Sequence, residues 1–505
     1  MRALLAVLAV ASLSACGRVS GDDPGAVGHR DDAAASEVGA DETTIVDAHV
    51  EPADDTAEVG HGPFRVRWAR QAHATSIADP LGLLLTPTGD LVVAGLLSGA
   101  IDFGSGPLHA DSSAYVARLS ADGVTQWATT VDRSPCDRFP SGAALVSDSI
   151  WVVGAALGAR ADGGCWFNGD PDGVADAVAW RVSLDGAVLP GSPISIVGGG
   201  KPGFTGAGSV IALDDGTAVV RGGWRGKGVF ADGTFESSAS RLWTASFGGD
   251  GGFRWVRRRD DSPAGYGFGS GVAVPGGYVL FGGFSGTIDL GTGPLKAGSP
   301  RDLLLASFDG GGAIRWARRY DGTAIARPGY LARDKSGDLV ATANANGVVT
   351  FGPTPLTTRG RDGLVMRFSA DGSIVAATLV GTDGDDNVQA PVIDDGGDVF
   401  VCGFAEEAVS RDDAGGVELR SRATIDRLSA SLVEKSRWTS PAAPFDPSRP
   451  SSASAGHLAV RGGTLFVAGS FSGDLTLGAT TLSAPGLTDP AKGPTFDAFV
   501  AAFEP

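Results

Sequence analysis

No stretch of this 505-residue chain carries a sustained apolar stripe at helical spacing, so almost no helix is expected. The six histidines are scattered, and no histidine-rich metal site is evident. The chain also lacks a G-x-S-x-G elbow, a phosphate-binding loop and a dinucleotide fingerprint. Basic residues are scarce, with 40 Lys and Arg against 58 Asp and Glu and a formal net charge of −18. That balance argues against a nucleic-acid partner and against flat adsorption on anionic membranes.

A repeat of about sixty residues runs through most of the chain. Each copy holds a short apolar run, a tight polar turn that supplies positive φ, and an apolar hairpin strand. The hairpin strand recurs at residues 90–99, 149–158, 217–226, 277–286, 338–347, 398–407 and 464–473. A third strand, a glycine-rich turn and a fourth strand that usually carries a tryptophan complete the pattern. Regular spacing of this length predicts a solenoid or a propeller.

The two ends of the repeat distinguish these architectures. The last copy stops at Pro505, directly after its third strand, whereas residues 64–68 (FRVRW) form a lone fourth strand. Pairing FRVRW beside residues 497–503 would complete the last sheet and remove an exposed edge. A solenoid needs polar caps, but a ring hides its ends in each other. We therefore predict an all-β fold, a seven-bladed β-propeller over residues 63–505 closed by an N-terminal strand that completes the last blade.

The N-terminal segment predicts export. Arg2 and the apolar run 3–15 are typical of a secretory signal peptide, and the run is too short to span a membrane. Residues 13–16 (LSAC) resemble the lipobox of bacterial lipoproteins, which implies cleavage before Cys16 and lipid attachment to it. The alternative is secretion after Ala15 with Cys16 as an unmodified thiol. Residues 16–62 carry 12 acidic and 2 basic residues, which predicts a disordered acidic tether. We expect a monomer anchored in the cell envelope through its lipid, at the outer membrane or cell surface.

The other three cysteines receive two roles. Cys402 occupies the repeat position of Ala94, Val153, Phe281 and Ala468, which predicts a small buried apolar side chain. Cys136 lies in a loop between repeats and Cys165 in a loop between second and third strands, and both kinds of loop emerge on one face of a propeller. In an oxidising compartment, this placement predicts a disulfide between Cys136 and Cys165.

The connections between repeats are long and unlike one another, whereas the turns on the opposite face are short. Long loops on a rigid scaffold are where binding usually resides, so we place the binding site on the long-loop face. The candidate side chains are Arg259, Asp260, Tyr266, Arg319, Tyr320, Arg327 and Tyr330. Arginines directly after the repeated tryptophan, such as Arg257 and Arg258, are better explained as charges that protect the outer edge strand.

One short segment has the spacing of metal ligands. Asn168, Asp170, Asp172 and Asp176 follow the pattern N-x-D-x-D-G-x-x-D, which resembles the calcium loops of EF-hands and of some other propellers. No glutamate stands at the twelfth position, and Asp176 also aligns with an aspartate that recurs at the start of the third strand. Calcium is therefore one hypothesis and a structural aspartate the other. The second acidic group, Asp383, Asp385 and Asp386, lacks the spacing and is expected in a solvated loop.

The segment GYVLFGGFSGTIDLGTGPL, followed by DLLLASFD and GAIRWARR, resembles the bacterial seven-bladed β-propeller repeat of exported proteins. That resemblance implies fold and export but no catalytic residues. A likeness of ADGVTQW and GGGAIRW to the tryptophan-docking repeat of quinoprotein propellers is weaker, because those units are shorter. We favour a lipoprotein that binds a protein or polysaccharide, or scaffolds an envelope assembly, and that needs no cofactor except possible calcium. The alternative is an exported propeller enzyme, a hydrolase or lyase acting on polysaccharide, or a quinoprotein-like oxidoreductase. An enzyme of this kind would bring perturbed acids together near the ring axis.

Overall fold

The structure is a computed structural model that describes residues 64–132, 138–158, 174–259, 267–299, 301–351, 355–411, 416–442, 451–484 and 495–505. Within these ranges every regular element is a β-strand. The sequence of the repeats explains this. Strands that are buried on both faces have continuous apolar runs, whereas half-buried strands alternate apolar and polar residues. No helix that could cross a membrane is found among the described residues.

The strands form antiparallel sheets in which most consecutive strands are neighbours. The first sheet contains β2 (Ile77–Leu85), β3 (Leu91–Asp102), β4 (Pro107–Leu119) and β5 (Thr125–Thr130). The second contains β6 (Arg138–Val146), β7 (Ser149–Leu157), β8 (Val174–Ser183) and the first part of β9 (Ile194–Ala212), and the third contains the rest of β9 with β10 (Ala218–Phe230), β11 (Gly233–Phe247) and β12 (Phe253–Arg259). The fourth contains β13 (Gly267–Val274), β14 (Gly277–Phe284), β17 (Asp302–Asp309) and β18 (Ile314–Tyr320). They continue with β19 (Ile325–Arg333), β20 (Leu339–Val349), β21 (Leu356–Phe368) and β22 (Ile374–Val380); β23 (Asp386–Ile393), β24 (Val399–Arg411), β25 (Gly416–Leu428) and β26 (Glu434–Thr439); and β27 (Ser452–Arg461), β28 (Thr464–Ser472), β31 (Asp497–Glu504) and β1 (Arg65–Ala74). The exceptions to this order flank two small hairpins, β15 (Thr287–Asp289) with β16 (Pro294–Lys296) and β29 (Asp474–Leu477) with β30 (Thr480–Ser483), so that β14 pairs with β17 and β28 with β31.

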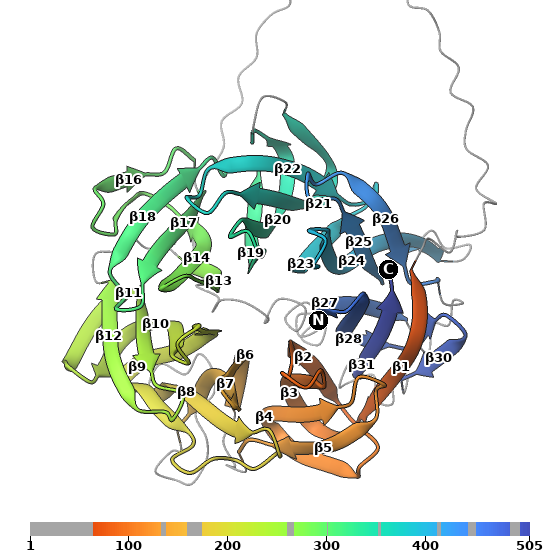
Figure 1. Ribbon diagram of the computed structural model, residues 1–505, viewed down its shortest axis with the longest axis horizontal. Coiled ribbons are helices and arrows are strands. Elements are labelled where there is room, and N and C mark those ends of the chain that lie inside the picture. Colours follow the sequence, from red (N-terminus) through yellow and green to blue (C-terminus); the bar gives the residue numbers. More distant parts are fainter. Residues whose placement is uncertain are drawn as a thin grey trace, which may run out of the picture.

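These sheets stand around a common axis as the blades of a β-propeller. In Figure 1, strands β2, β6, β13, β19, β23 and β27 surround the centre, and strands β5, β12, β18, β22, β26 and β1 lie at the rim. Each sheet therefore runs outward from the axis, and its flat faces meet the neighbouring sheets. The first strand of each repeat lines the axis, where side chains from different sheets can meet.

Strand β1 lies beside the C-terminal strand. It pairs antiparallel with β31 from Arg65 opposite Glu504 to Ala72 opposite Ala498. Its last residues then leave that sheet and pair with the end of β3, with His73 opposite Asp102. Figure 1 shows β1 at the rim, next to β31 and close to β4 and β5. The N-terminal strand thus joins the sheet that contains the C-terminal strand to the sheet that follows it around the ring.

The repeated tryptophan of the outer strand packs against the next sheet. Three indole N–H groups donate to a turn carbonyl of that sheet: Trp68 to Ala121 at 3.0 Å, Trp127 to Leu184 at 3.0 Å, and Trp255 to Gly310 at 3.1 Å. The ring lies over a glycine of the same turn, as Trp255 does over Gly312. A Cβ at Gly312 would lie 2.8 Å from the ring, and the residue has a φ of +79°. Glycine is the residue type that suits both conditions.

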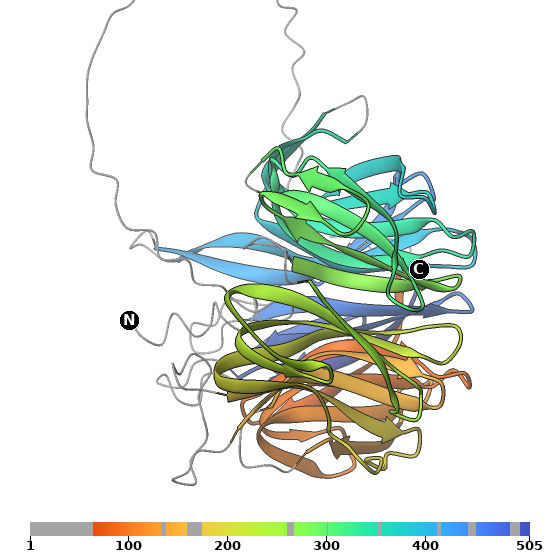
Figure 2. The same cartoon turned by 90° about the vertical axis from the view of Figure 1, so that its left-hand side faces the viewer.

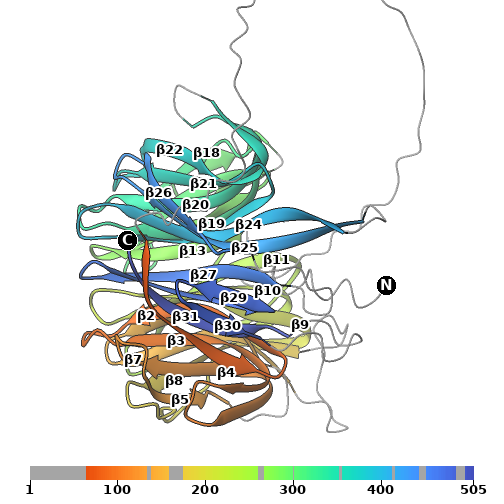
Figure 3. The same cartoon turned by 90° about the vertical axis from the view of Figure 1, so that its right-hand side faces the viewer.

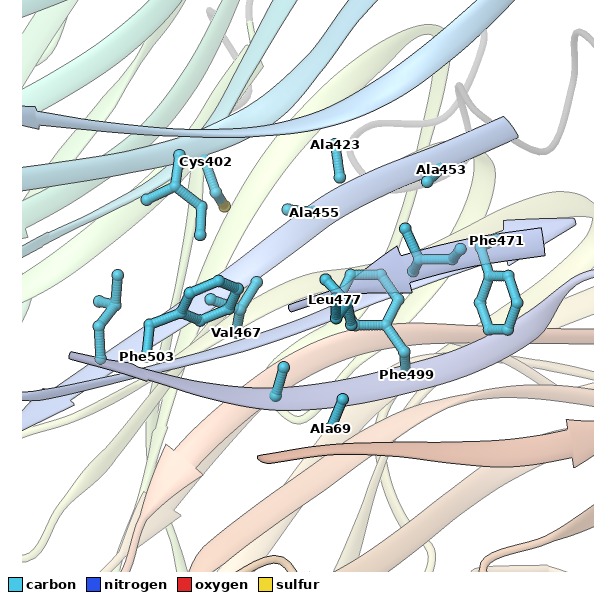
Figure 4. Close-up of a cluster of buried hydrophobic side chains, with 14 of the residues drawn as sticks. Ala69, Cys402, Ala423, Ala453, Ala455, Val467, Phe471, Leu477, Phe499 and Phe503 are labelled. Carbon is cyan, nitrogen blue, oxygen red and sulfur yellow. The ribbon is translucent and has the colours of Figure 1, made fainter. Parts of the chain in front are cut away.

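The apolar cores lie between neighbouring sheets. Figure 4 shows one of them, in which Cys402 and Ala423 face Val467, Phe499 and Phe503. Cys402 is 1% exposed and has a free thiol, so the prediction of a small buried side chain there is confirmed. Because every sheet contributes to the cores on both of its sides, packing in this fold is shared around the ring.

Two long hairpins project on one side of the disc. Figure 3 shows β24–β25 and β10–β11 extending beyond the sheets on this side, and Figure 2 shows the same projection from the other edge. Their tips connect the second and third strands of a sheet, and the connections between sheets emerge on the same side. The opposite side carries tight turns, such as the one in which Gly89 N–H donates to Thr86 O. The two faces of the propeller are therefore unequal, with the longer hairpins on the long-loop side.

Candidate functional site

Side chains from separate sheets meet at the ring axis. The ring of Tyr330 on β19 stands edge-to-face against the imidazole of His457 on β27, with centroids 6.1 Å apart and an interplanar angle of 84°. His457 also hydrogen-bonds to the backbone of Pro80 on β2, which has only a carbonyl to offer. Sheets that contain β2, β19 and β27 thus contribute to one small cluster, which we call the axial cluster and define as Pro80, Arg327, Tyr330 and His457.

The axial cluster holds two neutral ionisable groups. Burial lowers the pKa of His457 to about 4, against the opposing effect of its hydrogen bond to Pro80. Burial raises the pKa of Tyr330 to about 12, although the nearby charge of Arg327 acts in the other direction. At neutral pH His457 is therefore an uncharged imidazole and Tyr330 an uncharged phenol. An acid or base works best with a pKa near the operating pH, so this pair suits hydrogen bonding and aromatic contact better than proton transfer.

The remaining loop candidates occupy different environments. Arg259 lies with its guanidinium 5.4 Å from the ring centre of Phe308. Arg319 pairs with the buried carboxylate of Asp302. Tyr320 is 9% exposed, packs in a core, and donates its hydroxyl proton to the carbonyl of Gly372. Of the predicted candidates, the structure brings Arg327 and Tyr330 together, whereas Arg259, Arg319 and Tyr320 make contacts within and between sheets. Asp260 and Tyr266 lie outside the described residues.

A second group of polar residues lies between the β19–β22 and β23–β26 sheets. Its members are Asp362, Asp386 and Asp426, which we call the acid cluster, and each is at most 5% exposed. The prediction of a solvated loop is wrong for Asp386, because it is the first residue of β23 and opposes Ala405 in β24. Asp383 and Asp385 are paired with Arg359 and Arg361 at 2.6 and 2.7 Å, in agreement with an exposed position.

Burial dominates the electrostatics of the acid cluster. It raises the pKa of Asp426 to about 6, with Arg437 acting in the other direction from a distance of 2.5 Å. It also raises the pKa values of Asp362 and Asp386. A pocket of about 10 Å³ lies beside Asp386, Asp426 and Arg437. That is room for about one water molecule or one monatomic ion, and it is too small for a sugar residue.

The predicted calcium loop lies mostly outside the described residues. Asn168, Asp170 and Asp172 are not described, and Asp176 accepts a hydrogen bond from the backbone N–H of Gly199 at 2.7 Å. No group of three or more His, Cys, Asp or Glu side chains in the described ranges is arranged to hold a metal ion. Cys16, Cys136 and Cys165 also lie outside these ranges.

His457 and Pro80 were missed by the sequence argument. His457 stands alone in its segment (SAGHLAV), and nothing near it in the sequence indicates a polar site. The sequence feature that could have identified His457 is its position in the repeat, because it lies on the first strand and the first strand of each repeat lines the axis. Asp426 offered a clearer signal, because it stands where the corresponding strands have Ala306 and Ala501.

Comparison with known proteins does not assign a family. No family model and no curated protein sequence matches the chain. Solved structures of low similarity include virginiamycin B lyase from Staphylococcus aureus, with 10% identity, a TM-score of 0.39, and coverage of 87% of this chain and 99% of that one. Kuenenia stuttgartiensis hydrazine synthase has 12% identity, a TM-score of 0.44, and coverage of 78% and 93%. A Bombyx mori GH32 β-fructofuranosidase has 10% identity, a TM-score of 0.32, and coverage of 86% and 93%. At these scores the similarities carry no inference about activity.

Proposed function

We propose that this chain is an exported lipoprotein whose propeller binds polysaccharide at the long-loop face, centred on the axial cluster. The observation that carries the proposal is the contact between Tyr330 and His457 at the ring axis, with the charge of Arg327 near Tyr330. Aromatic rings beside neutral hydrogen-bonding groups are suited to bind hydroxylated ligands. A guanidinium adds paired N–H donors that can bind carboxylate or phosphate substituents. A protein ligand on the same face is the other form of the binding function.

The scaffold in this proposal is a ring of seven blades, completed when β1 supplies the outer strand of the last sheet. The antiparallel register between β1 and β31 supports it. So does the hydrogen bond from Ala74 N–H to Asp497 at 2.8 Å, because Gly322 N–H donates to the corresponding Asp302 in another sheet. A closed ring would hold the axial cluster in a fixed geometry, which lowers the entropic cost of binding.

The enzyme alternative receives less support. Near the axis, the pKa of His457 is lowered to about 4 and that of Tyr330 is raised to about 12, so both values lie far from neutral pH. The raised carboxyl pKa values lie in the acid cluster, beside a space too small for a sugar. Binding without chemistry is therefore the function that the arrangement suits best.

The binding proposal is tested with Tyr330→Phe, which removes one hydroxyl and keeps the ring. Loss of one ligand hydrogen bond worth about 1 kcal/mol predicts roughly fivefold weaker binding to the polysaccharide that the unaltered chain retains, from a panel of neutral and acidic polysaccharides. Tyr278→Phe is the control, because Tyr278 is fully buried in a core between sheets. Equal affinity of both variants, or no retention of any polysaccharide, contradicts the proposal. Anchoring is tested separately, since Cys16→Ala moves the protein from the membrane fraction to the soluble fraction if Cys16 carries the lipid.

A further inference from the structure

A cavity of about 270 Å³ lies at the rim of the propeller, between β1 and the start of β5. Its apolar walls come from four residues on or beside separate strands: Ala72, Phe103, Leu119 and Val500. Ala72 and Leu119 are buried, whereas Val124 at the mouth is 60% exposed. The cavity therefore has an apolar interior and opens to solvent at the rim, apart from the axial cluster.

The repeat shows what occupies the corresponding space at another junction between sheets. Tyr320 in β18 has the repeat position of Ala72, four residues after the tryptophan of its strand. Each lies opposite the residue that follows the recurring aspartate of the third strand. The ring of Tyr320 packs against Phe351 and Phe368, at centroid distances of 6.3 and 5.0 Å. The residues that correspond to these two in the repeat are the cavity walls Phe103 and Leu119. Alanine at position 72 thus leaves a cavity where the other junction holds a phenol ring.

A third junction places another flat group at this position. Arg259 corresponds to Ala72 in the repeat, and its guanidinium lies 5.4 Å from the ring centre of Phe308, which corresponds to Leu119. Where valine stands at this position, as at Val131 and Val380, the side chain is buried in a core between sheets. The position therefore points between the sheets, and the space in front of it suits a planar group.

One cation lines the cavity. Arg70 is exposed and donates from Nε to the carbonyl of Gly123 at 3.1 Å and from Nη1 to a carbonyl of its own strand. The corresponding Arg318 at the β18 junction also pairs with the carboxylate of Asp371 at 3.5 Å. Within the described part of the chain no carboxylate pairs with Arg70, although Asp122 stands where Asp371 does. The guanidinium of Arg70 therefore keeps N–H groups that can bind an acid.

We propose that this cavity binds a small aromatic acid, with its ring against Phe103 and Leu119 and its carboxylate paired with Arg70. The ring takes the place that Tyr320 has at the β18 junction, and the acid supplies the charge that Asp371 supplies there. Apolar cavities of about 150 Å³ bind benzene, so this larger one has room for a fused ring. The site lies at the rim, so the proposal does not depend on ligand binding at the axial cluster.

The test is calorimetric titration of the full chain with 2-naphthoate and with its neutral counterpart, 2-naphthalenemethanol. The unaltered chain binds 2-naphthoate and melts at a higher temperature with it, because a ligand that binds only the folded state stabilises that state. Ala72→Tyr abolishes binding, because the new ring fills the cavity. Arg70→Gln weakens binding of the acid by about two- to fivefold, as expected for an exposed ion pair, and leaves binding of the alcohol unchanged. Arg67→Gln is the control on the same strand, because Arg67 faces Glu504, and it leaves the binding of both compounds unchanged.

Three results overturn the proposal. They are no binding of 2-naphthoate by the unaltered chain, unchanged binding by Ala72→Tyr, and equal losses for the acid and the alcohol in Arg70→Gln. Loss of binding in Tyr330→Phe with Ala72→Tyr unaffected would place the compound at the axis and also refutes the rim site. If Ala72→Tyr does not fold, crystals of the unaltered chain soaked in 6-bromo-2-naphthoate give the answer. An anomalous bromine peak beside Phe103 and Leu119 supports the site, and peaks only elsewhere refute it.

Discussion

The contact between Trp255 and Gly312 offers a direct test of how neighbouring sheets are held together. Replacing Gly312 with alanine places a Cβ 2.8 Å from Trp255 Cη2 and 3.0 Å from Cζ3. It also forces an L-residue to adopt a φ of +79°. The left-handed conformation costs about 1–2 kcal/mol. Overpacking against a ring that is fixed by its hydrogen bond to Gly310 costs about 1–3 kcal/mol more. We expect Gly312→Ala to lower the free energy of unfolding by about 2–5 kcal/mol in total.

A second glycine separates the two contributions. Gly463 has a φ of +75°, and a Cβ added there would meet nothing within 4 Å. Gly463→Ala therefore carries the conformational cost alone, about 1–2 kcal/mol. Urea unfolding followed by far-ultraviolet circular dichroism compares the two variants. Adding Trp255→Leu to Gly312→Ala should recover the clash contribution, since the ring is gone. Equal losses for Gly312→Ala and Gly463→Ala would refute the reasoning that the ring and the glycine form a fitted pair.

Two further predictions concern pH and the pairing of β1. Between pH 7 and 5 two buried groups act in opposite directions. Burial raises the pKa of Asp426 to about 6, so its protonation adds stability as the pH falls. Burial lowers the pKa of His457 to about 4, so stability is lost as the pH falls through the unfolded-state pKa of that imidazole. The melting temperature of Asp426→Asn should therefore fall more steeply from pH 7 to 5 than that of the unaltered chain. Below about pH 4 both proteins should lose further stability, because Asp334 and Asp398 have lowered pKa values and lose their stabilising charge; equal pH dependence of the two proteins between pH 7 and 5 contradicts this assignment. Cysteines in place of Ala69 and Ala501, which are opposite each other in β1 and β31, should form a disulfide that stabilises the oxidised protein by about 2–4 kcal/mol. Free thiols after oxidation would show that the two strands do not pair in solution.

The strands and their order could be predicted because the same local sequence pattern recurs many times along the chain. Apolar runs, turn glycines and a tryptophan at about sixty-residue spacing predicted the all-β fold. The pairing of FRVRW with the C-terminal strand was predicted from the same pattern, and β1 does lie beside β31. Cys402 could be placed because its repeat position holds apolar residues in several other copies, among them Ala94, Val153 and Phe281. Local sequence determines these features, so a single chain suffices to read them.

The axial contact and the acid cluster could not be predicted, because both depend on how separate sheets face each other. Tyr330 and His457 belong to non-consecutive repeats, and no spacing rule within one repeat relates them. Asp386 belongs to an acidic run that resembles a solvated loop, yet the register of β23 against β24 buries it. Tyr320 was expected on a loop, but it ends β18 and turns into the core. In each case the environment depends on how strands and sheets pack in three dimensions, which the local pattern does not encode.

Departures from the repeat are more informative about function than the repeat itself. Asp426 stands where the corresponding strands carry Ala306 and Ala501, and burial in that position penalises its charge. Asp362 keeps the recurring aspartate but lacks the donor that satisfies it in other sheets. Burial of a carboxylate costs folding free energy. The cost is largest where an oxygen lacks a partner, as Asp362 Oδ1 does, and smaller where a guanidinium pairs with the group, as Arg437 does with Asp426. Violations of local rules that persist in an otherwise consistent fold are expected at functional sites. At the junction of β22 with β23–β25, such departures couple the protonation of buried carboxyl groups to folding stability.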